Sequence, residues 1–153
     1  MKKSFAVMVM GLLFLLAGIA QAADNKTGTP GEAKNLVSKA TAYVKSKGKA
    51  AAIKAFNSPT GGFIDRDLYI FAVDLGGMTL ANGGNPKLVG KSMMPVRDPQ
   101  NKYFIKEMIE VAKTKGSGWV DYKWTNPVTK QLLDKTSYVQ MVEDMVIGCG
   151  AYK

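Results

Sequence analysis

The stretch that decides the fold is Leu-Tyr-Ile-Phe-Ala-Val-Asp at residues 68–74. Aromatic and β-branched side chains fill most of these positions and leave little polar surface, which is typical of a central β-strand buried on both faces. Gly76 and Gly77 follow and predict a tight turn, after which residues 78–81 return as a second, antiparallel strand. The fold is therefore expected to be built around a sheet.

A long helix is predicted before this strand pair. Thr29, Pro30 and Glu32 have the spacing of an N-cap, a first-turn proline and a capping box. Apolar residues then recur at helical spacing as far as Gly48, with lysines between them. A second short helix is predicted over residues 49–56, before a loop rich in Gly and Pro.

Another helix is predicted after the second strand. The connection over residues 82–97 is long and polar, and Asp98-Pro99 has the pattern of a helix start. The apolar face of this helix would include Phe104, Ile105 and Met108, and Gly116 would end it.

The last third of the chain is rich in strands. Residues 118–124 alternate, with Tyr122 and Trp124 on one face, and a hairpin loop begins at residue 125. Residues 135–142 and 145–152 predict two further strands joined by a tight turn. Short turns make neighbouring strands antiparallel. We therefore expect an α+β fold with one five-stranded antiparallel sheet, a long N-terminal helix and a helix between strands two and three.

The first residues have the three parts of an export signal. Lys2 and Lys3 precede an uncharged apolar run over residues 5–19, and Ala20-Gln21-Ala22 supplies the small-x-small cleavage pattern. The run of about 15 residues is shorter than the roughly 20 that a membrane span needs. We expect cleavage after Ala22, a flexible leader over residues 23–30, one domain over 31–153 and a periplasmic location; an uncleaved membrane anchor is the alternative.

Composition excludes several classes of function. The 153 residues include no His and one Cys, so a Ser-His-Asp triad, a His zinc site and an internal disulfide are all excluded. No convincing nucleophile is present, and we expect neither catalysis nor a cofactor nor a metal. The net charge of +9 comes from scattered lysines with only two arginines, which argues against nucleic-acid readout. A basic scaffold that binds a protein partner or an anionic surface stays open as an alternative.

Several short motifs occur together in one order. They are Gly61-Gly62-Phe63, the strand at residues 68–74, Asn85-Pro86-Lys87, Gly118-Trp119-Val120-Asp121-Tyr122, Trp124-Thr125-Asn126-Pro127 and Gly148-Cys149-Gly150-Ala151-Tyr152. In this order they resemble the single Cache domain, type two, an extracytoplasmic sensor module of bacterial chemoreceptors and sensor kinases. The resemblance covers about residues 33–152. Because the chain stops at the last strand, it resembles a free-standing Cache protein.

The resemblance implies a PAS-like sheet and a small-molecule pocket on the face away from the long helix, with a small organic acid as ligand. It also implies a membrane sensor kinase, chemoreceptor or transporter as partner, and it leaves monomer and homodimer both open. Where the family often has a His after the second strand, this chain has Asn82. Any role of an imidazole at that position is therefore lost.

A pocket for a small carboxylate needs a cation or several N–H and O–H donors, together with apolar walls. The candidate ligand-binding residues are Tyr69, Phe71, Met94, Arg97, Tyr103, Tyr122, Trp124, Lys135 and Tyr138. Lys135 has the alternative of a solvated strand end, Arg97 that of a surface residue, and the aromatic residues that of core packing. Lys135 and Tyr138 are three residues apart, so in a regular strand they point to opposite faces.

Overall fold

A computed structural model describes residues 27–153, and the predicted signal peptide lies outside the described residues. The elements in chain order are α1 (Pro30–Lys47), α2 (Lys49–Asn57), β1 (Ile64–Asp65), β2 (Leu68–Tyr69), β3 (Phe71–Asp74), β4 (Thr79–Asn82), the 3-10 turn η1 (Pro86–Leu88), α3 (Phe104–Lys115), β5 (Ser117–Thr125), β6 (Leu132–Val142) and β7 (Met145–Tyr152). None of the helices in this range is long and apolar enough to cross a bilayer.

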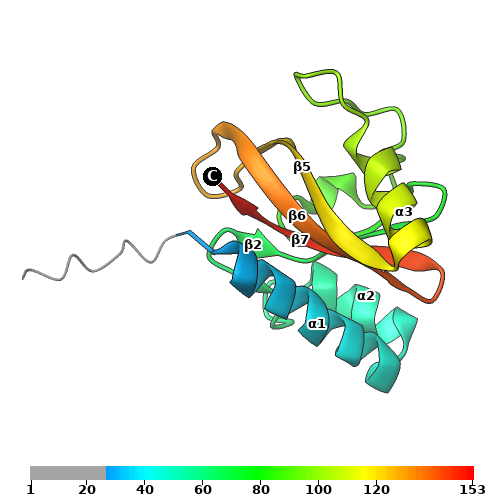
Figure 1. Ribbon diagram of the computed structural model, residues 1–153. Coiled ribbons are helices and arrows are strands. Elements are labelled where there is room, and N and C mark those ends of the chain that lie inside the picture. The colour runs from blue at the N-terminus through cyan, green and yellow to red at the C-terminus, as the bar shows by residue number, and fades with distance from the viewer. Residues whose placement is uncertain (1–26) are drawn as a thin grey trace, which may run out of the picture.

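The main sheet has five strands in the order β4-β3-β7-β6-β5, and every neighbouring pair is antiparallel. Helices α1 and α2 cover one face and α3 covers the other (Figure 1). The last strand in the sequence, β7, lies at the centre and all of its residues are buried. The predicted α+β fold, with a long first helix and a helix between the second and third strands of the main sheet, is confirmed.

Two apolar clusters hold the layers together. One cluster lies between the sheet and α1 and includes Ile70, Ile147 and Cys149. The other lies between the sheet and α3 and includes Phe71 and Val146. Successive strand residues alternate between the two clusters, because side chains along a strand point to opposite faces. The face beneath α3 is the one that carries the site described below.

The N-terminal end of α1 is fixed as the sequence predicted. The Thr29 side chain accepts the N–H of Glu32, and the Glu32 carboxylate accepts the N–H of Thr29, which completes a capping box. Just before it, the N–H of Gly28 donates to Asp67 Oδ1 at 2.7 Å, and Gly28 is buried. The predicted leader reached residue 30, whereas the structure has the chain already held at Gly28.

Two predicted elements need correction. The predicted strand at residues 68–74 is two strands, because β2 pairs with β1 in a separate small sheet and β3 pairs with β4 and β7. The third helix begins at Phe104 and not at Asp98. The Asp98 side chain instead accepts the backbone N–H groups of Gln100 and Lys102, and such local bonds compete with helix formation.

Candidate functional site

A small cavity lies between the sheet and α3. Its walls come from β2, β3, β4, β5, the connection after η1 and α3, and consist of Tyr69, Phe71, Val73, Thr79, Asn82, Met93, Phe104, Ile105, Tyr122 and Trp124. The cavity volume is about 20 Å³, and one water needs about 10–15 Å³ measured in this way. In this conformation the walls therefore leave little space between them, and a larger guest requires the walls to move apart.

Four of the predicted site residues meet in these walls: Tyr69, Phe71, Tyr122 and Trp124. The Phe104 ring stacks on Tyr122 with centroids 4.6 Å apart and planes 9° apart, and its edge meets Trp124 at 5.3 Å. An open groove borders the cavity at Tyr69 and Trp124 and continues between η1 and the β5–β6 hairpin. Tyr69 and Trp124 thus line both the cavity and the groove.

Lys135, also predicted, is buried behind Tyr69 and is not itself a wall of the cavity. Its side chain is 1% exposed, and its Nζ donates to Tyr69 Oη at 2.9 Å and to Tyr152 Oη at 3.3 Å. Nζ also lies over both rings, 4.2 Å from the centroid of Tyr69 and 4.7 Å from that of Tyr152. Over residues 27–153 no carboxylate forms an ion pair with Lys135. A buried cation is thus held by phenol oxygens and aromatic faces alone, and one of its three N–H donors has no acceptor in this range.

The last strand provides the space for this lysine. A Cβ on Gly150 would lie 2.5 Å from Lys135 Cε, closer than real Cβ contacts allow. Gly148 plays the same part for Phe71, whose ring lies against the glycine backbone. Residues 148, 150 and 152 share one face of β7 because of the two-residue strand period. Gly148 therefore leaves room for Phe71, and Gly150 leaves room for Lys135. Tyr152, the next residue on this face, accepts a hydrogen bond from Lys135.

The tyrosine hydroxyls of the site remain protonated. Burial raises the pKa of Tyr69 to about 12, and burial likewise raises the pKa values of Tyr122 and Tyr152. The Tyr152 hydroxyl donates to the carbonyl of Thr125 at 2.9 Å, so its oxygen is left to accept. The Tyr69 hydroxyl accepts from Lys135 and has only a long 3.5 Å contact with Tyr152 Oη for its own proton. Tyr69 is consequently a neutral donor, polarised by the ammonium behind it and facing the cavity.

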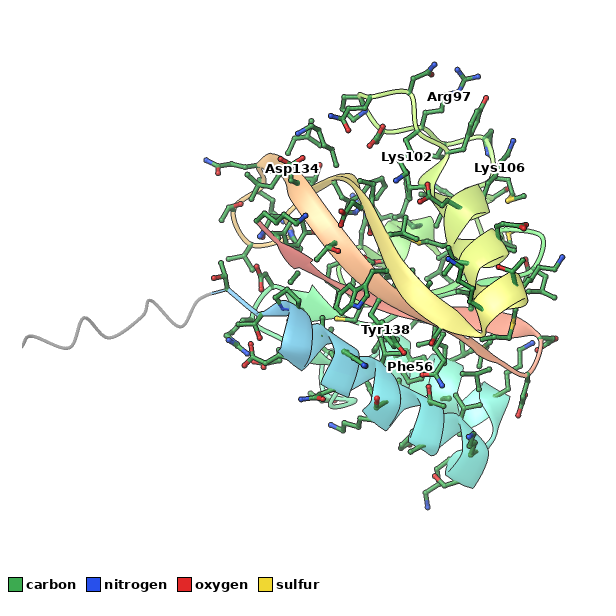
Figure 2. The ribbon with its side chains drawn as sticks, viewed as in Figure 1. Phe56, Arg97, Lys102, Lys106, Asp134 and Tyr138 are labelled. Carbon is green, nitrogen blue, oxygen red and sulfur yellow. The ribbon has the colours of Figure 1, made fainter. Side chains whose placement is uncertain are left out.

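The remaining predicted residues lie elsewhere. Tyr138 is on the opposite face of the sheet, toward α1, with the Trp119 ring 5.3 Å away (Figure 2). Arg97 is on the connection that leads into α3, where it donates to Asn101 and lies over the Tyr103 ring at 4.4 Å (Figure 2). Met94 packs against the apolar cluster beneath α3 but is not a cavity wall. The cavity is therefore not lined by any of four predicted residues: Met94, Arg97, Tyr103 and Tyr138.

Three polar residues at or beside the cavity were not among the predicted site residues: Tyr152, Thr79 and Asn82. Tyr152 could have been found from the strand period, since it shares a face with Gly148 and Gly150. Thr79 and Asn82 line the cavity from β4, although they are three residues apart. As for metals, the acidic residues and Cys149 of the described part of the chain form no group that could hold an ion.

Comparison with known proteins identifies the family of this chain. The family model described as "Single Cache domain 2" matches residues 2–153. The chain belongs to this family. Cache domains of this kind are extracytoplasmic sensor domains of chemoreceptors and sensor kinases.

Curated relatives of this Cache domain are signalling proteins. The methyl-accepting chemotaxis protein McpP of Pseudomonas putida is 33% identical over 90 residues, which cover 58% of this chain and 16% of the relative. The sensor histidine kinase MctS of Rhizobium johnstonii is 33% identical over 89 residues, 57% of this chain and 19% of the kinase. The match thus spans less than a fifth of either relative.

Solved structures show the same fold. A methyl-accepting chemotaxis protein of Vibrio parahaemolyticus superimposes with a TM-score of 0.70 at 22% identity, over 80% of this chain and 86% of that one. A Cache chemosensory domain whose structure was described as the basis for carboxylic acid recognition gives a TM-score of 0.63 at 26% identity, over 80% and 86% of the two chains.

Proposed function

We propose that this Cache domain is an exported, non-catalytic sensor module that binds a small carboxylic acid beneath α3. The carboxylate is held by the Tyr69 hydroxyl and the Lys135 ammonium, and Tyr122 and Trp124 form the aromatic walls. The ligand-loaded form is read by a membrane partner such as a sensor kinase, chemoreceptor or transporter, and the protein works in the periplasm.

The observation that carries the proposal is the buried ammonium without a counter-ion. Removing a charge from water is costly unless an opposite charge or several hydrogen bonds replace the water. The two phenol oxygens and two aromatic faces around Lys135 supply part of this compensation. A bound carboxylate would supply the rest, and the free Tyr69 proton and the third N–H of Lys135 are the donors that it would use.

The small volume of the cavity agrees with a sensor in which binding and movement are coupled. Residues of the connection and of α3, including Met93 and Phe104, form the wall opposite the sheet. Admitting an acid must displace this wall, because the present volume holds little more than a water. A displacement of α3 against the sheet is a change that a partner protein could detect.

The comparisons add support at the level of ligand class and partner class. One similar structure is a Cache domain described as recognising carboxylic acids, and the curated relatives are a chemoreceptor and a sensor kinase. The geometry supports binding over catalysis, because the site has a cation and neutral phenols but no group placed as a nucleophile or general base.

The test is a ligand screen of residues 23–153 by thermal shift, followed by calorimetry, against acetate, propionate, pyruvate, lactate and a broader metabolite panel. A ligand at 100 times its Kd stabilises by about 2.7 kcal/mol, which for a domain of this size is a shift of roughly 10 °C. The Lys135→Met variant should remain folded and lose the shift, whereas Lys54→Met, at an exposed lysine of α2, should keep it.

A panel in which no compound shifts the melting temperature would overturn the proposal. So would a Lys135→Met protein that binds the acid as tightly as the wild type, because the ammonium would then play no part in recognition.

A further inference from the structure

A buried hydroxyl in the cavity wall has nothing to bind. Thr79 is 3% exposed and lines the cavity, and its Oγ1 has no hydrogen-bond partner within residues 27–153. Buried polar atoms are normally paired, since an unpaired one loses its water without compensation. A hydroxyl left in this state beside a cavity points to a group that enters from that cavity.

A second polar side chain of the same wall has a spare donor. Asn82 Oδ1 accepts the backbone N–H groups of Gly84 at 3.1 Å and Asn85 at 2.8 Å. These two donors identify the oxygen of the amide and fix its orientation. The other end of the amide, Nδ2, has no acceptor in the described part of the chain and, unlike Thr79 Oγ1, is still in contact with solvent; Asn82 lines the cavity.

A β-bulge brings these two side chains to one face. Along the β3–β4 pair, Asn82 lies opposite Phe71 and Ala81 opposite Ala72, but Thr79 lies opposite Val73, so Leu80 is an extra residue. In a regular strand, residues 79 and 82 would point to opposite faces. The extra residue returns both to the cavity side, and bulges are a common means of re-aiming side chains at functional sites.

The pair is also adjacent to the carboxylate end of the site. The turn that follows Asn82 packs against Tyr69, because a Cβ on Gly84 would lie 2.5 Å from the Tyr69 ring. Along β2 and β3, Tyr69, Phe71 and Val73 follow one another in the cavity wall. Asn82 pairs with Phe71, and Thr79 pairs with Val73. The cavity wall therefore has Tyr69, backed by Lys135, at one end, and Asn82 and Thr79 on β4 beside the apolar Phe71 and Val73.

We infer that Thr79 and Asn82 form a second polar subsite that binds an oxygen atom of the ligand other than its carboxylate. The preferred ligand is then an oxygenated carboxylic acid, a hydroxy or oxo acid, and not a plain alkanoic acid. This inference rests on the proposed carboxylate-binding function. Asn82 Nδ2 donates to the hydroxyl or carbonyl oxygen, and Thr79 Oγ1 donates to a carbonyl or exchanges a hydrogen bond with a hydroxyl.

The selectivity arises because an unsubstituted acid would leave the polar groups of Thr79 and Asn82 without a hydrogen-bond partner. When an alkanoic acid fills the cavity, it excludes water from Thr79 and Asn82 and gives them no partner. A site built to hydrogen-bond a ligand oxygen discriminates strongly against an analogue that lacks it. The oxygenated acid forms hydrogen bonds with both side chains, so neither of them loses its water without a replacement.

Calorimetry with matched acids tests the inference. Propionate is compared with lactate and pyruvate, and butyrate with 3-hydroxybutyrate, on the wild type and on the Thr79→Val and Asn82→Asp variants. The wild type should bind at least one oxygenated acid tenfold or more tighter than its plain counterpart. Thr79→Val should weaken the oxygenated acid about five- to tenfold and leave the plain acid unchanged. Asn82→Asp retains the acceptor of the turn but loses the donor and adds a negative charge, so it should weaken both acids and the oxygenated acid more.

A matched control lies on the other side of the sheet. Thr41 Oγ1 is also buried and unpaired, but it belongs to α1 and is far from the cavity wall, so Thr41→Val should change no affinity. Without ligand, Thr79→Val should melt at or above the wild-type temperature. A lower melting temperature would mean that a structural water already pairs Thr79, which contradicts the inference.

The outcomes separate the two proposals. A wild type that binds none of the acids or metabolites overturns the proposed function. A wild type that binds acids without preferring the oxygenated ones, or a preference that survives both variants, overturns only the Thr79–Asn82 subsite.

Discussion

The substitution Gly150→Ala tests whether the space for Lys135 is built into β7. The new Cβ would lie 2.5 Å from Lys135 Cε and 2.9 Å from the carbonyl oxygen of Thr136, and it would also overlap Ser137 Oγ. The φ angle of Gly150 is not in the left-handed region, so the effect is one of overlap and not of backbone strain. Overpacking of this kind costs about 1–3 kcal/mol.

The lysine is the part of this contact that can move. The carbonyl of Thr136 is held in the β6–β7 ladder, where Thr136 pairs with Ala151. The Lys135 stem must therefore swing away, which lengthens its 2.9 Å bond to Tyr69 Oη. We expect acid affinity to fall at least tenfold, equivalent to about 1.4 kcal/mol, and the free protein to melt roughly 4–12 °C lower.

The assay is thermal melting of the free protein together with calorimetric titration of the acid that the screen identifies. Gly31→Ala is the matched control, because Gly31 is in the first turn of α1 and its nearest neighbour to a new Cβ is 3.9 Å away. That change should stabilise by up to about 1 kcal/mol. A Gly150→Ala protein with wild-type melting temperature and affinity would refute the reasoning.

Further predictions concern the frame of the site and its response to pH. Thr29→Ala removes the capping box of α1 and should lower the free energy of unfolding by about 1 kcal/mol in urea titrations. Asp98→Ala should cost about 3 kcal/mol by the same measurement, because three backbone N–H groups, those of Gln100, Lys102 and Lys123, lose their acceptor; a loss below 0.5 kcal/mol would contradict it. Hydrogen bonding to Arg66 lowers the pKa of Glu32 to about 2, and the backbone donors lower the pKa of Asp98. Carboxyl groups with depressed pKa values contribute stability above their ordinary pKa that is lost as the pH falls, so melting temperatures should drop between about pH 4.5 and pH 2 and not between pH 6 and 8.

Most of the fold could be predicted because strand and helix periods are local properties of the sequence. The alternation of residues 118–124 placed Tyr122 and Trp124 on one face, and the capping box fixed the start of α1. The start of the third helix was wrong for a local reason too. Asp98 binds the N–H groups of its own loop, and that competition depends on the conformation the loop finally adopts.

The site was harder to predict because it depends on pairing between distant strands. The same period rule separated Lys135 from Tyr138, but it did not reveal which of the two would be buried beside Tyr69. The bulge that aligns Thr79 with Asn82 arises from the register between β3 and β4. That register has no signature within β4 itself, so an amide and a hydroxyl three residues apart gave no indication of a shared wall.

The central claim is that a carboxylate is held by Tyr69 and Lys135 in the space beneath α3. A crystal structure of residues 23–153, grown with the acid that gives the largest thermal shift, tests it most directly. We predict a carboxylate oxygen within hydrogen-bond distance of Tyr69 Oη and Lys135 Nζ, with α3 displaced from the sheet. An acid bound only in an outer groove, with the wall beneath α3 unchanged and closed, would contradict the account.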